Sequence, residues 1–357
     1  MTYQNFGLKF DPFAHLDSTK DARLYEYLVI PRAVEIAWGD KPTAIFAKPG
    51  GGKSALRTYT ELVYRGTRGV KLPITYVPDT YSSEPDFHFF GLSQSLARAV
   101  MIYLISYPDI FLQFSSTRQA ETKHLLIHLP YELNFILDIL AKAQSTAEIE
   151  QLFGVRAISG IEKLGKAHQE MIRLLRCNQV AKTGETNIIT LMTQAKEIFE
   201  IASFHILVDG LDGFIETAEK RSLLKWIAPL LNIADSWAQQ HIYIKLFLPL
   251  TISDFPEIHT CAYMQTASLD WDDGLLAEVI RRRLYVASNG SFDSLDALST
   301  PDLHNVELHL ARQLDAEKKL PRQIIIKAHA LLKQAQKNPD LAIHYENLFR
   351  EEIRHVA

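Results

Sequence analysis

The sequence predicts an α/β protein built on a parallel sheet with helices on both faces, a three-layer arrangement. Short apolar runs rich in β-branched and aromatic residues alternate with helical stretches, which is typical of strands joined by crossover helices. These runs are apolar at nearly every position, as expected for strands buried on both faces of a sheet. A glycine-rich loop also joins the first strand to a helix. Strands are expected at residues 43–47, 72–77, 204–208, 242–248 and 262–266.

Helical spacing fills the stretches between and after these strands. A helix at 217–239 is expected to supply the crossover between the third and fourth strands. The stretch 82–203 is almost wholly helical, with an interruption at 182–186, and is far longer than one crossover needs, so it is expected to be a helical insertion. Further helices are expected at 273–288, 303–314, 321–335 and 342–356, with an exposed loop around 291–301.

Length and composition indicate a globular chain large enough for two packed units. The 357 residues are 47% hydrophobic and 22% charged, which provides ample apolar material for a core. The formal net charge is −4 at pH 7, so composition does not indicate a basic surface for DNA or an anionic membrane. Cys177 and Cys261 show neither CxxC nor Cys/His metal spacing. We therefore expect no disulfide and no structural metal.

The N-terminal sequence and the apolar windows bear on the cellular location. The first residues mix Lys and Asp with apolar side chains, unlike a secretory signal with its basic head and apolar run. The most apolar windows, 99–105 and 242–250, are shorter than the roughly 20 residues needed to span a bilayer. We expect a cytoplasmic protein without a membrane span.

The segment AKPGGGKS, residues 47–54, follows the first strand and opens a helix expected over 55–64. Consecutive glycines permit positive-φ turns that point N–H groups at an anion, and the absence of Cβ atoms lets phosphates approach closely. The helix N-terminus adds its partial positive charge. Lys53 would contact the β and γ phosphates, and the Ser54 hydroxyl would ligate Mg²⁺. The nucleotide-binding residues expected here are Pro49, Gly50, Gly51, Gly52, Lys53, Ser54 and Ala55. The alternative is a Gly/Pro turn followed by a solvated lysine.

The third strand ends in the acidic sequence DGLD, residues 209–212. Ligands of open α/β sheets bind at the carboxyl ends of the strands, so Asp209 would hold the water shell of Mg²⁺ as a second anchor beside Ser54. Asp212 could orient or deprotonate an attacking water. These assignments make Lys53, Asp209 and Asp212 the candidate catalytic residues. The alternative is a plain strand followed by an Asp-Gly turn.

Together, AKPGGGKS and the apolar strand ending in DGLD resemble the additional-strand (ASCE-type) P-loop NTPases, specifically the STAND class of NACHT and KAP type and the neighbouring AAA+ ATPases. The resemblance implies a Walker A loop, a Walker B strand and ATP with Mg²⁺ as cofactors. It also implies one strand between the two motif strands, and 72–77 lies between them in the sequence. Ala47 stands where the usual pattern has Gly, Gly210 stands where AAA+ enzymes have Glu, and Gly213 stands where NACHT-type sites have an acid. The missing acids imply slow hydrolysis.

The resemblance extends to the flanking segments. Pro321-Arg322 resembles the Pro-Arg sensor of the lid, which makes Arg322 an expected nucleotide contact. The Asp11-Pro12-Phe13 segment resembles the one that packs over adenine, so Phe13 is a candidate clasp for the base; the alternative is a strap packed on the core. This divides the chain into an N-terminal segment over the nucleotide site (1–40), an ATPase core (41–81 and 204–268), a helical insertion (82–203) and a C-terminal helical lid (269–357).

Two basic features remain open at this point. Arg281, Arg282 and Arg283 lie in a stretch that resembles the start of a STAND-type lid helix, where one of them could reach a neighbouring subunit as an arginine finger. The alternative is a solvated face with salt bridges. Lys245 lies inside an apolar strand and could face a carboxylate or extend to the sheet edge.

The leading hypothesis is an intracellular Mg-ATP-dependent STAND/AAA+-like ATPase that acts as a switch or assembly factor. The resemblance implies oligomerisation on ATP binding and a separate protein partner. One alternative is a DNA-associated AAA+ regulator of the replication-initiation or transposition type, whose binding would weaken with salt. The other is a small-molecule kinase on the same loop, which would transfer phosphate to an acceptor.

Overall fold

The structure is a computed structural model that describes residues 3–67, 69–78, 85–128, 133–143, 145–153, 164–176, 188–213 and 220–349. The chain divides into two compact units. The first unit comprises Met1–Glu35, Phe46–Tyr59 and Ala267–Ala357, and the second comprises Ile36–Ile45 and Thr60–Thr266. The glycine loop therefore belongs to the first unit, and the acidic strand belongs to the second.

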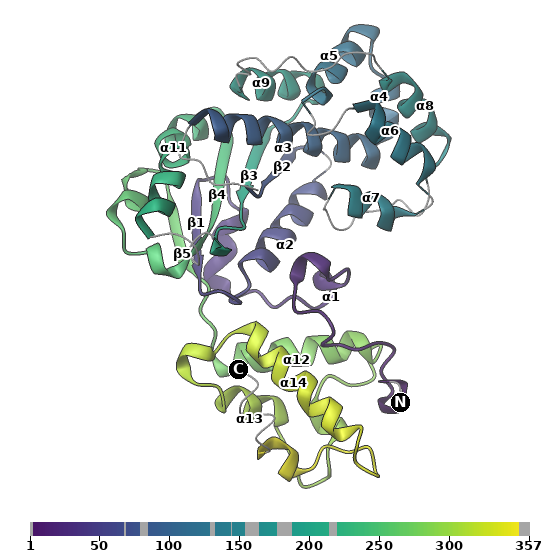
Figure 1. Ribbon diagram of the computed structural model, residues 1–357, viewed down its shortest axis with the longest axis vertical. Coiled ribbons are helices and arrows are strands. Elements are labelled where there is room, and N and C mark those ends of the chain that lie inside the picture. The colour runs from purple at the N-terminus through teal and green to yellow at the C-terminus, as the bar shows by residue number, and fades with distance from the viewer. Residues whose placement is uncertain are drawn as a thin grey trace. The chain divides into compact units, whose positions relative to one another are not determined.

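Five parallel strands form one sheet in the order β2-β3-β4-β1-β5, which confirms the predicted α/β class (Figure 1). The first four expected strands are confirmed within a residue or so at their ends. The fifth begins three residues and ends two residues later than predicted, because the backbone N–H groups of Ala262 and Tyr263 donate to the Asp235 carboxylate. The strands are β1 Thr43–Ala47, β2 Lys71–Tyr76, β3 Ser203–Val208, β4 Ile242–Pro249 and β5 Gln265–Ser268.

The strand between β1 and β3 in the sheet is β4, whereas β2 is at the edge beyond β3. Parallel pairing of β2 with β3 and of β3 with β4 places Leu72 beside Phe204 and Phe204 beside Ile242. The strand 72–77 lies between the two motif strands in sequence only. Order along the chain does not determine order in the sheet, because a crossover helix can carry the chain past several strands.

Helices of the second unit cover the sheet and extend from it. Helix α3 packs against β2 and also contacts helices α5 and α9, so it lies between the sheet and other helices of the region before β3 (Figure 1). Helix α11 packs against β4 and supplies the expected crossover. The predicted interruption at 182–186 lies outside the described residues. The helices are α3 Pro85–Ser106, α4 Pro108–Leu112, α5 Ser116–Leu126, α6 Leu133–Lys142, α7 Thr146–Phe153, α8 Lys166–Leu175, α9 Ile188–Phe199 and α11 Lys220–Ala238.

Helix α3 is long and apolar enough to cross a membrane by length and composition alone, since an 18-residue window within Phe87–Ser106 has a mean hydropathy of 1.3. The expectation that apolar windows fall short of this length is therefore wrong for α3. However, 61% of that window is buried inside the fold. Burial of this kind is typical of the central helix of a soluble α/β protein.

The first unit has its own apolar core between helices α12, α13 and α14 and the N-terminal segment. The stretch 291–301 is not an exposed loop throughout as predicted, because Leu295 in its 3-10 turn is fully buried. Only a 3-10 turn, Tyr345–Phe349, stands in the described part of the helix predicted at 342–356. The helices are α1 Leu24–Tyr27, α12 Asp273–Ala287, α13 Val306–Arg312 and α14 Pro321–Ala335; the 3-10 turns of the chain are Tyr3–Phe6, Ser18–Lys20, Arg32–Trp38, Leu250–Ile252, Pro256–Thr260, Leu295–Leu298, Ala316–Lys318 and Tyr345–Phe349.

Candidate functional site

The glycine loop, residues 48–52, joins β1 to helix α2, Lys53–Arg65. Gly50 and Gly52 have φ values of 78° and 97°, a region that favours glycine. The Gly51 N–H donates to the Lys48 carbonyl at 2.9 Å. A Cβ at Gly51 would lie 2.9 Å from that carbonyl oxygen and 3.0 Å from the Ala47 Cβ. All three glycines are therefore required by this backbone, two for their conformation and one for space.

Lys53 begins helix α2 and folds back over the loop. Its side chain is buried, and its Nζ donates to the carbonyl oxygens of Ala47 at 2.8 Å and Lys48 at 3.3 Å. Ser54 and Ala55 follow in the first turn and are half-buried, while Pro49 in the loop is exposed. The loop thus combines a tightly turned backbone, a helix N-terminus and a held ammonium group, which together suit a phosphate chain.

Residues before and within α14 lie beside the loop in the same unit. The Arg322 backbone N is 3.5 Å from the Gly50 carbonyl oxygen, and a Cβ at Gly50 would lie 3.2 Å from the Arg322 Cβ. The Arg322 residue as a whole is exposed. The Lys48 Nζ donates to the Glu317 carbonyl at 3.4 Å. Arg322 therefore lies next to Gly50 of the loop, and its contact with a bound nucleotide stays a prediction.

Asp209 directly follows β3 in the second unit. It is buried, and its N–H donates to the carbonyl of Tyr76 at the end of β2, at 3.2 Å. Gly210 has a φ of 86°, and a Cβ there would lie 2.7 Å from a Val77 side-chain carbon. Asp212 is half-buried. Asp209 is thus held at the carboxyl edge of the sheet, the edge at which ligands of parallel sheets bind.

Phe13 is fully buried in the apolar core of the first unit, together with residues of α12, α13 and α14. Its N–H donates to the Asp11 carboxylate at 2.9 Å. This agrees with the alternative prediction, in which the segment around Phe13 packs on the core as a strap. A contact between the Phe13 ring and adenine stays a prediction, and it would require the ring to leave its present packing.

Arg283 is buried and fastens the N-terminal segment to α12. It donates to the Pro12 carbonyl at 2.8 Å, lies 3.5 Å from the Asp21 carboxylate and stacks over the Tyr27 ring at 4.4 Å. Arg282 donates to Glu278 at 2.8 Å on an exposed helix face. The salt-bridge alternative is therefore correct for Arg282. The finger role is wrong for Arg283, because its guanidinium is engaged inside its own unit.

Sequence reasoning missed the hydrogen-bond partners of Lys245, which are backbone carbonyls and a hydroxyl instead of a carboxylate or the solvent. Its side chain is fully buried, and its Nζ donates to the Gly39 and Lys41 carbonyls, both at 2.6 Å, and to the Thr43 hydroxyl at 3.1 Å. Burial lowers the pKa of Lys245 to about 7. The Lys245 side chain thereby ties β4 to the turn that enters β1. In the sequence, the one indication of a special role for Lys245 was its charge within an otherwise apolar strand.

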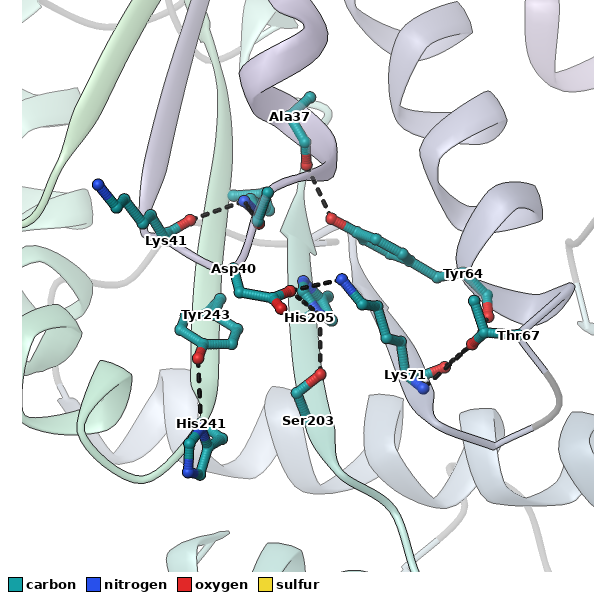
Figure 2. Close-up of polar contacts among 12 residues, drawn as sticks. Ala37, Asp40, Lys41, Tyr64, Thr67, Lys71, Ser203, His205, His241 and Tyr243 are labelled. Atoms are coloured by element: carbon teal, nitrogen blue, oxygen red, sulfur yellow. Dashed lines mark hydrogen bonds and ion pairs between the residues drawn. The ribbon is translucent and has the colours of Figure 1, made fainter.

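A Ser-His-Asp set adjoins this turn at the amino ends of the strands (Figure 2). Ser203 Oγ is 3.1 Å and Asp40 Oδ1 is 3.5 Å from the same atom, Nε2 of His205. Nδ1 of His205 is buried and has no hydrogen-bond partner among the residues that the structure describes. A nucleophilic triad needs Ser and Asp on opposite ring nitrogens, so this set cannot activate Ser203. Burial lowers the pKa of His205 to about 2, and its ring packs on Tyr64 with centroids 4.0 Å apart. We assign the set a structural role.

Within the described ranges, no group of three or more His, Cys, Asp or Glu side chains is placed to hold a metal ion. A magnesium ion whose ligands are mostly phosphate oxygens and water would not require such a group. The positive-φ glycines Gly50 and Gly52 and the folded Lys53 side chain suit the phosphate chain of a nucleotide.

No protein-family model matches the chain, and no curated protein matches it.

Proposed function

We propose that this chain is a Mg-ATP-binding ATPase of the additional-strand P-loop type, similar to STAND and AAA+ proteins. The observation that carries the proposal is the strand, glycine loop and helix at residues 43–65, with Lys53 folded over turned glycines. Backbone N–H groups of the loop and of the first helical turn would bind the phosphates, and Lys53 would neutralise their charge.

The strand order supports a role for Asp209 in the same chemistry. With β4 between β1 and β3, all three carboxyl ends belong to one edge of a parallel sheet. Ser54 and Asp209 would hold the magnesium ion, which supplies charge neutralisation at the phosphates. Asp212 would orient the attacking water or accept its proton. Gly210 and Gly213 stand where related enzymes carry further acids, which favours slow turnover.

Contacts between the loop and the C-terminal helices support a switch as the outcome of nucleotide binding. Lys48 contacts Glu317, and Gly50 contacts Arg322, so a change in the loop would reach the start of α14. A ligand shifts a conformational equilibrium when it binds one arrangement more tightly. We propose a cytoplasmic protein that assembles with copies of itself on ATP binding and works with a separate protein partner.

The proposal is tested by ATP binding and phosphate release. We expect Asp209→Ala to lower Mg-ATP hydrolysis at least about tenfold, because the metal loses its carboxylate anchor. Asp212→Asn is expected to retain binding and to slow phosphate release by about tenfold or more, because the amide cannot accept the proton. Isothermal calorimetry and a free-phosphate assay measure the two quantities.

Asp138→Ala is the control, because Asp138 pairs with the exposed Arg176 in the helical region, away from the residues of the proposed site. It should leave both quantities unchanged. A parent protein without measurable Mg-ATP affinity would remove the proposal. Transfer of phosphate to an added acceptor, in excess of free phosphate, would instead identify a kinase.

A further inference from the structure

Trp271 holds the middle of the glycine loop. It lies between β5 and α12 and belongs to the same unit as the loop. Its indole Nε1 donates to the Gly51 carbonyl oxygen at 2.9 Å. A Cβ at Gly52 would lie 3.6 Å from the Cζ2 atom of the same indole, so the ring edge also lies against Gly52. The side chain therefore contacts both residues of one peptide unit.

The hydrogen bond from Trp271 to the Gly51 carbonyl also orients the Gly52 N–H, because both groups belong to one peptide unit. In a planar trans peptide, the carbonyl of one residue and the N–H of the next point in opposite directions. A donor that fixes the Gly51 carbonyl therefore also fixes the direction of the Gly52 N–H. Glycine has little conformational preference of its own, and Gly52 already has a φ of 97°, so an external restraint is needed to hold one orientation.

Trp271 is itself held in place. The next residue, Asp272, caps α12 by accepting the Leu275 N–H at 2.7 Å. Asp273 forms an ion pair with Lys319 at 2.6 Å, which ties the start of α12 to the segment before α14. The indole is partly buried and packs against the apolar core of the first unit. Trp271 therefore connects the glycine loop to the start of α12, which is itself held by a helix cap and an ion pair.

We propose that Trp271 is a positioning residue for phosphate binding: its indole N–H orients the Gly51–Gly52 peptide so that the Gly52 N–H donates to the bound phosphates. This inference rests on the proposed nucleotide-binding function. The inference concerns the polyphosphate part of the ligand, because Trp271 would act through the Gly52 N–H, which donates to phosphate oxygens. It requires no contact between the indole and the base.

The test compares the parent protein with Trp271→Phe, which keeps an aromatic ring and removes the N–H donor. Binding of Mg-ATP and of magnesium tripolyphosphate, which has no base, is measured by calorimetry. We expect both affinities to fall by about tenfold, the effect of losing one hydrogen bond to a charged ligand. Trp38→Phe, in the other unit, is the control and should leave both affinities unchanged.

A loss of ATP affinity with tripolyphosphate affinity unchanged would mean that the indole contacts the base, and this would overturn the inference. Unchanged affinity for both ligands would overturn it as well. A second variant carries 3-benzothienylalanine at position 271, which replaces the indole N–H with sulfur and keeps the ring shape. It should reproduce the loss with the melting temperature of the ligand-free protein unchanged, even where Trp271→Phe folds poorly. Parent affinity in this variant would overturn the inference.

The outcome for Lys53→Ala separates the two proposals. If the parent binds Mg-ATP and Lys53→Ala does not, the nucleotide site stands regardless of the result for Trp271. If Lys53→Ala binds as the parent does, the proposed function itself fails. Parent-like binding by the Trp271 variants alone removes only the positioning role.

Discussion

Replacing Lys53 with alanine is expected to weaken Mg-ATP binding by about a hundredfold or more. A charge-assisted hydrogen bond contributes roughly 1.5 to 3 kcal/mol, and a lysine at this position would donate to more than one phosphate oxygen. In the structure the ammonium group is already held at the loop by the Ala47 and Lys48 carbonyls. Little rearrangement would then be needed to bring the charge to a phosphate. Calorimetric titration with Mg-ATP measures the change.

Lys48→Ala is the matched control for this experiment. Lys48 is the other lysine next to the glycines, and its Nζ donates to the Glu317 carbonyl. Its removal should change the affinity by less than about threefold, since a single exposed contact contributes little. Equal losses in both variants would show that only general positive charge matters. Circular dichroism of each variant verifies that α2 still forms.

Replacing Lys245 with methionine is expected to destabilise the protein by about 2 to 3 kcal/mol near pH 8. Methionine fills a similar volume, but it cannot donate to the Gly39 and Lys41 carbonyls or to the Thr43 hydroxyl. Of these groups, the Lys41 carbonyl still accepts from the Thr43 hydroxyl at 3.0 Å. The turn that enters β1 would then lose its attachment to β4. Urea unfolding monitored by circular dichroism measures the free energy.

The same substitution should change how stability depends on pH. Burial lowers the pKa of Lys245 from its ordinary value of 10.5 to about 7, so between these values the unfolded chain binds a proton that the folded chain does not. The stability of the parent relative to Lys245→Met therefore rises with pH across this window, at up to about 1.4 kcal/mol per pH unit. Well below pH 7 the difference in unfolding free energy between the parent and Lys245→Met should be constant, because Lys245 is then protonated in both the folded and the unfolded chain.

Lys71→Met provides the comparison for the unfolding free energy. Lys71 pairs with Asp40 at 2.5 Å, but these side chains are 24% and 51% exposed. A surface ion pair contributes at most about 1 kcal/mol, so this variant should be nearly as stable as the parent. A loss as large as that of Lys245→Met would contradict the assignment of the buried donor as the main attachment.

Local sequence patterns were sufficient to predict the strands of the sheet, helix α14 and the glycine loop. The strands β1, β3 and β4 are buried at every position, so their continuous apolar runs marked them directly. Helix α14 has the predicted bounds, with Pro321 in its first turn. The positive φ angles at Gly50 and Gly52 occur in the loop whose glycines suggested them. In these segments local preference and burial act in the same direction.

The contacts of single polar side chains could not be predicted in this way. Trp271 and Gly51 are 220 positions apart, and Lys245 and Gly39 are 206 apart, so no spacing in the sequence relates them. Arg283 carries the same charge as Arg282 next to it, yet one is buried against Asp21 and the other is exposed. The side of the helix that faces the core decides between them, and that depends on the packing of the whole unit.

The sequence by itself determined the α/β class, the position of the strands and the glycine loop with its lysine, because each depends on residues close together in the chain. Tertiary structure alone decided that β4 separates β1 from β3, that Lys245 closes the turn before β1 and that Trp271 contacts the loop. Each of these depends on backbone groups brought together by packing, and burial makes their hydrogen bonds obligatory because an unpaired polar group in the interior is costly.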